Sequence, residues 1–375
     1  MVVEGSRQET LDPAFVLPGT RHQGLPIILR ELAVSIPCHP ASQSYRAQIN
    51  PSVAWCSKKA CTMVKPKCDS SGLAIKTGGI RFQKTKGQHI LKNPLVITTM
   101  VEKSGIKSTD SLLEIGSGTG NLTVKLLEKG RKVYAFEIDP RMVSELQKRV
   151  QTSPHRTKLE ILVGDAIKAK SWPKFDLCVA NLPYKISSPF IQRLISAGRG
   201  FRAAVVMLQK EFADRLTAKP GDKLYCRLSA SAQFHFKIEQ LMKINRNSFR
   251  PPPRVDSAVV RIEPRHPLPP VTHSEWDGLL RLVFARKNKT IGANFSGKSI
   301  AAHLRKIYME TCCTKGLSPT PEVIACESTG VSAMEEKITS ILRDSGFEKK
   351  RARTLDEDDF LRLLLAFKKE NINFG

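Results

Sequence analysis

Short apolar runs alternate with amphipathic segments between residues 93 and 208, and this alternation constrains the chain more than any other feature. The apolar runs have the length of strands, and the segments between them have the spacing of helices. The predicted strands are Ser111–Ile115, Lys132–Glu137, Leu159–Val163, Phe175–Ala180 and Ala203–Leu208. This pattern is typical of an α/β fold in which helices cover both faces of a parallel, doubly wound sheet.

The segments between these strands predict the helices of the same domain. They are Asn93–Lys103, Leu122–Lys129, Met142–Val150 and Ser188–Ile195. Pro94 suits the first turn of a helix, where its missing N–H costs nothing. Two later apolar runs, Ser229–Phe236 and Ser257–Ile262, are expected to add strands to the sheet.

Composition divides the chain into three parts. Residues 1–75 are rich in Pro, Gly and Ser and lack periodicity, which predicts a disordered N-terminal extension. The α/β domain occupies residues 76–263. The Pro-rich stretch Pro264–Pro270 reads as a linker to a smaller helical domain, residues 264–375. The helices predicted there are Trp276–Phe284, Ser299–Tyr308, Met334–Leu342 and Phe360–Phe367.

The charge of the chain favours a polyanionic partner. Lys and Arg number 60 against 35 Asp and Glu, which gives a formal net charge of +25. Nucleic acid is the first interpretation, because counterion release drives binding to phosphates. An anionic membrane surface and a merely solvated basic surface are the alternatives.

No apolar run is long enough to span a membrane. The nine cysteines contain no C-x-x-C pair, so no metal site is predicted.

Polar residues follow the predicted strands, at the edge where doubly wound sheets bind ligands. Leu112–Gly120 is a strand that runs into a glycine loop. A dinucleotide fingerprint would need glycine at the position of Asn121, and no G-K-[ST] sequence marks a phosphate loop. The loop therefore indicates a ligand that contains adenosine without a pyrophosphate.

Two acidic residues end the next two strands. Glu137 is suited to accept hydrogen bonds from a ribose diol, and Asp165 is suited to accept from an adenine amino group. The alternatives are a solvated glutamate and an aspartate that caps a helix.

Asn181, Leu182, Pro183 and Tyr184 end the fourth strand and carry the most chemical information. An exocyclic adenine amine is a poor nucleophile, because its lone pair is delocalised into the ring. Acceptors at the Asn181 side chain and at the Leu182 or Pro183 carbonyl favour a pyramidal nitrogen whose lone pair points at a methyl donor. Pro183 stiffens the loop, and Tyr184 offers a flat face for stacking a base. The alternative is a plain turn that Asn181 caps.

Together these residues resemble the ribosomal RNA adenine N6,N6-dimethyltransferase family, in its eukaryotic nucleolar branch. The matching stretches also include Lys86–Leu91, Phe249–Val255 and Arg286–Thr290. The resemblance implies a Rossmann-like class I methyltransferase domain and a C-terminal helical RNA-binding domain. It further implies methyl transfer from S-adenosyl-L-methionine to N6 of two adjacent adenines near the 3′ end of small-subunit rRNA, with a role in ribosome biogenesis.

The resemblance also implies a role for each site residue. His89 and Leu91 would cover the methionine side of the cofactor, and Gly116 would lie beneath it. Glu137 would hold the ribose, Asp165 the adenine amine, and Asn181 would bridge cofactor and substrate.

Phe249 would form a second wall for the flipped adenine, or else be a core aromatic. Arg250 and Arg254 would meet phosphates, as would Arg286, Lys287 and Lys289, or else be solvated.

The chain departs from the family pattern at Ser117, where proline is usual, and in its long N-terminus.

The expected partner is small-subunit rRNA or a pre-ribosomal particle, and the expected state is a monomer that does not bind membranes. The expected location is the nucleolus or nucleus, with the mitochondrion as the alternative. A ribosome-assembly factor whose methylation is dispensable, and a methyltransferase that acts on DNA or on a protein glutamine, remain competing hypotheses.

Overall fold

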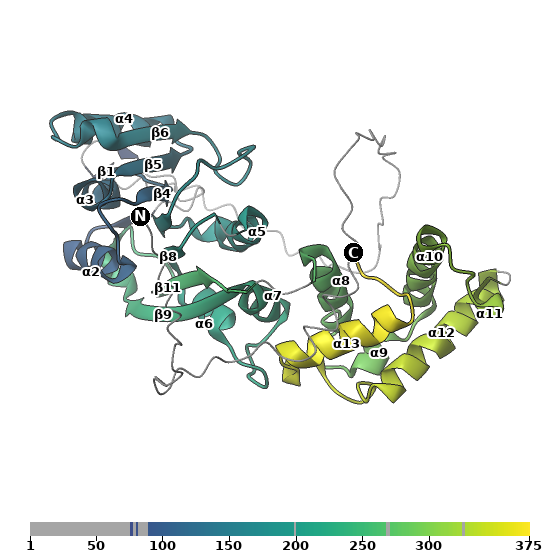
Figure 1. Ribbon diagram of the computed structural model, residues 1–375. Helices are drawn as coiled ribbons and strands as arrows, with labels where there is room; N and C mark the ends of the chain where they lie inside the picture. Colours follow the sequence, from purple (N-terminus) through teal and green to yellow (C-terminus); the bar gives the residue numbers. More distant parts are fainter. Residues whose placement is uncertain (1–75, 78–79, 82–88, 199, 268–270, 325–326) are drawn as a thin grey trace, which may run out of the picture.

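The computed structural model describes residues 76–77, 80–81, 89–198, 200–267, 271–324 and 327–375 (Figure 1). The predicted N-terminal extension, part of the Lys86–Leu91 stretch and the end of the Pro264–Pro270 stretch lie outside these residues. Within them, no helix is long and apolar enough to cross a membrane.

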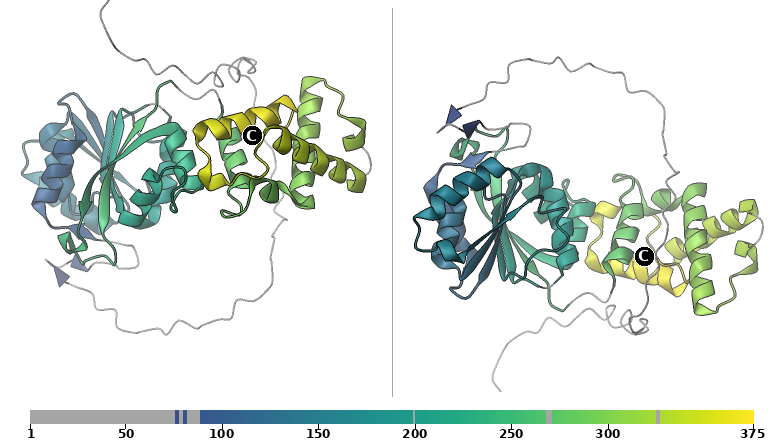
Figure 2. Two further views of the ribbon diagram at one scale, coloured as in Figure 1. Left: turned by 90° about the horizontal axis from the view of Figure 1, so that it is seen from below. Right: turned by 90° about the horizontal axis from the view of Figure 1, so that it is seen from above.

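A sheet forms the centre of the first domain (Figure 2). It has seven strands in the order β6-β5-β4-β7-β8-β11-β9. Strands β6, β5, β4, β7 and β8 are parallel, as the strand–helix alternation predicts. Strand β11 runs antiparallel to both of its neighbours, so the sheet is mixed at this edge. The strands are β4 (Ser111–Ile115), β5 (Lys132–Glu137), β6 (Leu159–Val163), β7 (Leu177–Asn181), β8 (Ala203–Gln209), β9 (Phe236–Ile244) and β11 (Ser257–Pro264).

Helices cover both faces of this sheet, because successive strand residues point to opposite sides. Leu112 and Val179 contribute to the apolar core on one face, and Leu113 and Ala180 to the core on the other. The first face packs against α2 (Pro94–Ser104), α3 (Asn121–Lys129) and α4 (Pro140–Gln151). The second face packs against α5 (Ser187–Ala197), α6 (Lys210–Thr217) and α7 (Arg227–His235).

The predicted elements differ from the structure in one change of type and two changes of length: the predicted helices Ser299–Tyr308 and Met334–Leu342 are parts of the longer helices Lys298–Lys315 and Glu327–Asp344. Strand and helix bounds from Asn93 to Gln209 match the predictions to within a few residues. The predicted strand Ser229–Phe236 is wrong, because this segment forms helix α7 and the strand begins at Phe236. The buried side chains of this helix are Phe234 and the consecutive small residues 229–232, which point to several sides of the helix. Its sequence therefore shows no amphipathic period.

The C-terminal part is helical in its described residues, apart from one isolated β-bridge between Thr290 and Arg351 (Figure 1). They are α8 (His273–Val283), α9 (Ile291–Phe295), α10 (Lys298–Lys315), α11 (Pro321–Ile324), α12 (Glu327–Asp344) and α13 (Glu357–Lys369). Their apolar core includes Phe234 of α7, which stacks on Trp276 with ring centroids 3.6 Å apart. Helix α7 therefore packs against both the sheet and the helical part.

Candidate functional site

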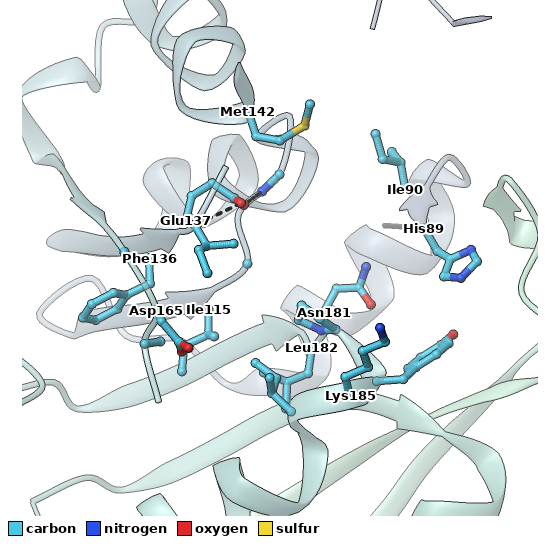
Figure 3. A pocket seen from close by; sticks show the side chains of 18 of the residues that line it. His89, Ile90, Ile115, Phe136, Glu137, Met142, Asp165, Asn181, Leu182 and Lys185 are labelled. Atoms are coloured by element: carbon cyan, nitrogen blue, oxygen red, sulfur yellow. Dashed lines mark hydrogen bonds between the residues drawn. The ribbon is translucent and has the colours of Figure 1, made fainter. Parts of the chain in front are cut away.

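Two adjoining cavities open at the carboxyl ends of β4, β5, β6 and β7, and Figure 3 shows the larger of them. The larger has a volume of about 360 Å³ and the smaller about 70 Å³. His89, Gly116 and Asn181 are among the residues that line both cavities. In the larger cavity, Glu137 and Asp165 lie on one side of Asn181 and His89 on the other (Figure 3). The fold thus brings together residues that the sequence separates by almost a hundred positions.

The glycine loop passes beneath the cavities in a conformation that needs its glycines. Gly116 has φ 76°, and an added Cβ would lie 3.1 Å from Cδ of Pro183. At Gly120, with φ 82°, a Cβ would lie 2.6 Å from Cδ1 of Leu146. L-residues rarely adopt such angles, and a Cβ would press on the Pro183 ring at Gly116 and displace the end of Leu146 at Gly120. The loop is therefore packed directly against Pro183 of the Asn181–Tyr184 segment.

The Glu137 carboxylate is held by the backbone at the end of β5. Oε2 accepts a hydrogen bond from the N–H of Gly118 (2.8 Å), and Oε1 accepts from the N–H groups of Ile138 and Asp139 (both 3.0 Å). These three bonds fix the carboxylate at the wall of the larger cavity. Because each oxygen has two acceptor sites, Oε2 retains capacity for a hydroxyl donor such as a ribose.

Asp165 caps a turn and also faces the larger cavity. Its Oδ1 accepts from the N–H of Ile167 at 2.9 Å and so stabilises the turn 166–168, which is not a helix, so the helix-capping alternative does not apply. Among the described residues no hydrogen bond to Oδ2 is found, and the side chain lines the cavity. The two roles are thus compatible in one carboxylate.

The Asn181–Tyr184 segment lies at the carboxyl end of β7, where the two cavities meet. The side-chain amide of Asn181 makes no hydrogen bond within the part of the chain that is described, and it lines both cavities. Leu182 is buried, and its N–H donates to the Met207 carbonyl of the next strand. Tyr184 begins the short 3-10 helix η3 (Tyr184–Ile186) and lines the larger cavity. An amide free to bind a ligand therefore lies beside a rigid, partly aromatic wall.

A two-stranded ribbon joins the predicted cofactor side to the predicted substrate side. Strand β3 (Ile90–Leu91) pairs antiparallel with β10 (Phe249–Arg250), so Leu91 lies opposite Phe249. The Asn121 side chain donates to the Leu91 carbonyl at 2.9 Å, which attaches the ribbon to α3. Phe249 is only 2% exposed and belongs to the apolar core, yet it also lines the larger cavity. Phe249 is therefore both a core aromatic residue and part of the wall of the larger cavity.

The basic residues of the matching stretches are separated in the structure. Arg250 lies in the ribbon and Arg254 four residues after it; both are exposed, and neither lines the cavities. Arg286 and Lys289 are exposed in the C-terminal helical part, where Lys287 donates to the Lys223 carbonyl. A phosphate-binding role for these side chains stays a prediction.

The structure adds Glu114, a residue that the sequence reasoning missed. This carboxyl group lies in β4, is 1% exposed and lines the smaller cavity. Its Oε2 has no hydrogen-bond partner among the described residues. Burial raises its pKa to about 8; the Thr123 hydroxyl opposes this shift, and the charge of Glu137 adds to it. The sequence signal for this site is Glu114 itself, an acidic residue between the apolar residues Leu113 and Ile115 of a predicted buried strand.

The buried carboxyl of Glu114 fits a cationic ligand group in the smaller cavity, because an unpaired buried carboxylate is costly. The Ser117 hydroxyl, at the position where the family usually has proline, also lacks a partner in the described chain and lines the same cavity. Apolar residues such as Met142 and the half-exposed Ile138 complete the larger cavity beside Glu137. The residue set suits a ligand with an adenosine at one end and an amino acid at the other.

The stability of the Glu114→Gln variant relative to the ligand-free wild type is expected to increase as the pH rises. The unfolded carboxyl titrates near 4.5 and the folded one near 8, so the fold binds the proton more tightly between these values. Wild-type stability should therefore fall across this window, by on the order of a few kcal/mol, whereas glutamine cannot ionise. Melting temperatures at pH 5 and pH 9 test this; a difference between the two proteins that does not change with pH would contradict it.

No group of three or more His, Cys, Asp or Glu side chains that could hold a metal ion occurs within the described residues. The polar groups that line the two cavities include two strand-end carboxylates, one buried carboxyl group and the side-chain amide of Asn181.

Comparison with known proteins gives a consistent result. Residues 79–315 match the family model described as ribosomal RNA adenine dimethylase. The chain is 49% identical over 306 residues to a dimethyladenosine transferase of Yarrowia lipolytica, which covers 82% of this chain and 95% of the relative. It is 46% identical over 330 residues to a ribosomal RNA small subunit methyltransferase of Arabidopsis thaliana, with 79% and 93% covered. A crystal structure of a dimethyladenosine transferase from Plasmodium falciparum superposes with a TM-score of 0.69 at 42% identity, covering 76% of this chain and all of that one.

Proposed function

This chain belongs to the ribosomal RNA adenine dimethylase family, and we propose that it methylates N6 of two adjacent adenines near the 3′ end of small-subunit rRNA. It is an S-adenosylmethionine-dependent adenine dimethyltransferase with a class I methyltransferase fold. The observation that carries the proposal is the free amide of Asn181 at the junction of the two cavities, beside the wall that Tyr184 forms.

The residues present fit S-adenosylmethionine. When bound, this cofactor supplies an electrophilic methyl group on a positively charged sulfur. Glu137 would hold the ribose, and Asp165 would accept from the adenine amine through Oδ2. Glu114 would pair with the amino group of the methionine part in the smaller cavity. Gly116, His89 and Leu91 would enclose that part from the glycine loop and the ribbon.

The chain's own groups would align the substrate amine. The Asn181 side-chain oxygen and the Leu182 or Pro183 carbonyl would accept hydrogen bonds from N6, so that its lone pair points at the methyl group. The bound cofactor would supply the methyl group to N6 held by these acceptors, and the methylated amine would release one proton to solvent. Alignment contributes more than base strength to such a transfer, because the leaving group is already activated. Tyr184 and Phe249 would hold the adenine between them after it leaves its stack.

The positive charge of the chain supports RNA as the partner, and the exposed Arg250 and Arg254, together with the C-terminal helices, would supply contacts to its phosphates. We place the protein in the nucleolus, acting on pre-ribosomal particles as a monomer during ribosome biogenesis; a mitochondrial member of the family is the alternative.

The test is methyl transfer from labelled S-adenosylmethionine to immature small ribosomal subunits, with nucleosides identified by mass spectrometry. N6,N6-dimethyladenosine at adjacent positions near the 3′ end is the expected product. Binding of the subunit and of the cofactor without any methylated adenosine would favour the assembly-factor hypothesis instead. Methylated DNA or protein glutamine in parallel reactions would contradict the proposed substrate.

A further inference from the structure

The hydroxyl of Tyr184 is held by a residue that is distant in sequence. Tyr184 Oη and Ser257 Oγ are 2.7 Å apart, although 73 positions separate the two residues. Ser257 is fully buried and begins β11, where it pairs with Gln209 on one side and Ile244 on the other. Its backbone is thus fixed by two neighbouring strands, so its hydroxyl is a rigid anchor for the tyrosine.

Two further contacts fix the same tyrosine. The hydroxyl of Ser187, which is 3% exposed, donates to the Tyr184 carbonyl at 3.0 Å. The Tyr184 ring stacks on His89, with centroids 5.9 Å apart and planes inclined by 27°. His89 Nδ1 lies 2.9 Å from the Pro251 carbonyl, which can only accept, so this nitrogen carries the proton. The backbone, the ring face and the hydroxyl of Tyr184 are therefore each held by a different element.

The anchored hydroxyl points to a geometric role for Tyr184. Burial raises the pKa of Tyr184, as does the charge of Glu211, while the bond to Ser257 lowers it in part; the net shift keeps the phenol protonated. A protonated phenol that is already hydrogen-bonded is poorly placed to exchange protons with a substrate. What the arrangement provides is a ring of fixed orientation at the wall of the cavity.

We propose that Ser257 is a positioning residue for methyl transfer, because its hydroxyl fixes through Tyr184 the ring plane on which the target adenine stacks. The inference rests on the proposed function. Dimethylation makes particular use of such a plane, because the same adenine must be aligned for two successive transfers. A loosened ring releases the monomethylated base more often before the second transfer.

The experiment compares Ser257→Ala, Tyr184→Phe and the double variant as full-length proteins acting on immature small subunits. Each single variant is expected to lower kcat about three- to tenfold, the range of one hydrogen bond, and to leave cofactor affinity unchanged. The ratio of monomethyl- to dimethyladenosine should rise in both. The double variant should be no slower than the slower single variant, because both changes remove the same bond. Ser257→Thr, which keeps the hydroxyl, should restore most of the activity and the product ratio.

Ser231→Ala is the matched control. Ser231 is 1% exposed, and its hydroxyl has no partner in the described chain and does not line the cavities. It should keep wild-type kcat and product ratio. Unchanged kcat and product ratio in Ser257→Ala would overturn the inference, as would effects that multiply in the double variant. A loss of kcat that only follows the folded fraction, with an unchanged product ratio, would make Ser257 merely structural. Failure of the proposed function appears differently, as an absence of dimethyladenosine with the wild type.

Discussion

Asn181→Ala is expected to lower kcat for methyl transfer by about 10²- to 10³-fold, the range seen when a preorganised polar group is removed from an active site. The amide lies at the junction of the two cavities and has no partner within the described residues, so it is available to the substrate amine. Single-turnover methyl transfer to small subunits measures the effect, and product nucleosides identify the step that is lost.

Cofactor binding separates the two roles assigned to Asn181. If the amide acts mainly on the substrate amine, cofactor affinity should fall by less than about tenfold, or 1.4 kcal/mol, while kcat falls far more. Asn181→Asp keeps an acceptor oxygen and should retain more activity than alanine does. Retention of most of wild-type kcat in Asn181→Ala would contradict the proposed alignment of N6, and an equal loss of affinity and kcat would move Asn181 to cofactor binding alone.

Gly116→Ala should weaken cofactor binding by about 10- to 100-fold. The new methyl group would meet Cδ of Pro183 at 3.1 Å, and the backbone would have to keep φ 76° with a side chain present. The left-handed conformation alone costs about 1–2 kcal/mol for an L-residue. Because Pro183 and Gly116 face each other across the cavity floor, relief of the clash displaces the very residues that form the site. Calorimetric titration with the cofactor measures the loss.

Gly105→Ala is the matched control for this substitution. Gly105 ends helix α2 with φ 64°, and an added Cβ would meet no atom within 4 Å. Both variants should lose stability in thermal unfolding, Gly116→Ala the more because its methyl group also meets Pro183, whereas only Gly116→Ala should lose cofactor affinity. If both variants bind the cofactor equally well, the contact between the glycine loop and Pro183 does not shape the site.

The sequence by itself determined the parallel part of the fold and the edge at which the site lies. Apolar runs of strand length and amphipathic segments depend on local periodicity, which the chain displays directly, so the bounds of β4, β5 and β6 were predicted to the residue. Strand-end positions of Glu137, Asp165 and Asn181 followed from the same pattern, because parallel strands place their carboxyl ends at one edge. Local periodicity failed at α7, where burial on several sides removes the polar face that marks a helix.

Only the tertiary structure decided which distant residues meet. The pairing of Leu91 with Phe249, the bond from Tyr184 to Ser257 and the approach of Pro183 to Gly116 join elements that no local pattern relates. The reversed direction of β11 is a further example, since an apolar run carries no mark of its orientation. Glu114 is a carboxylate in the sequence, but its unpaired oxygen and raised pKa arise from the strands and loop that close around it. Periodicity reports which face of an element is buried; contacts and ionisation depend on what buries it, and this is fixed only when the whole chain has packed.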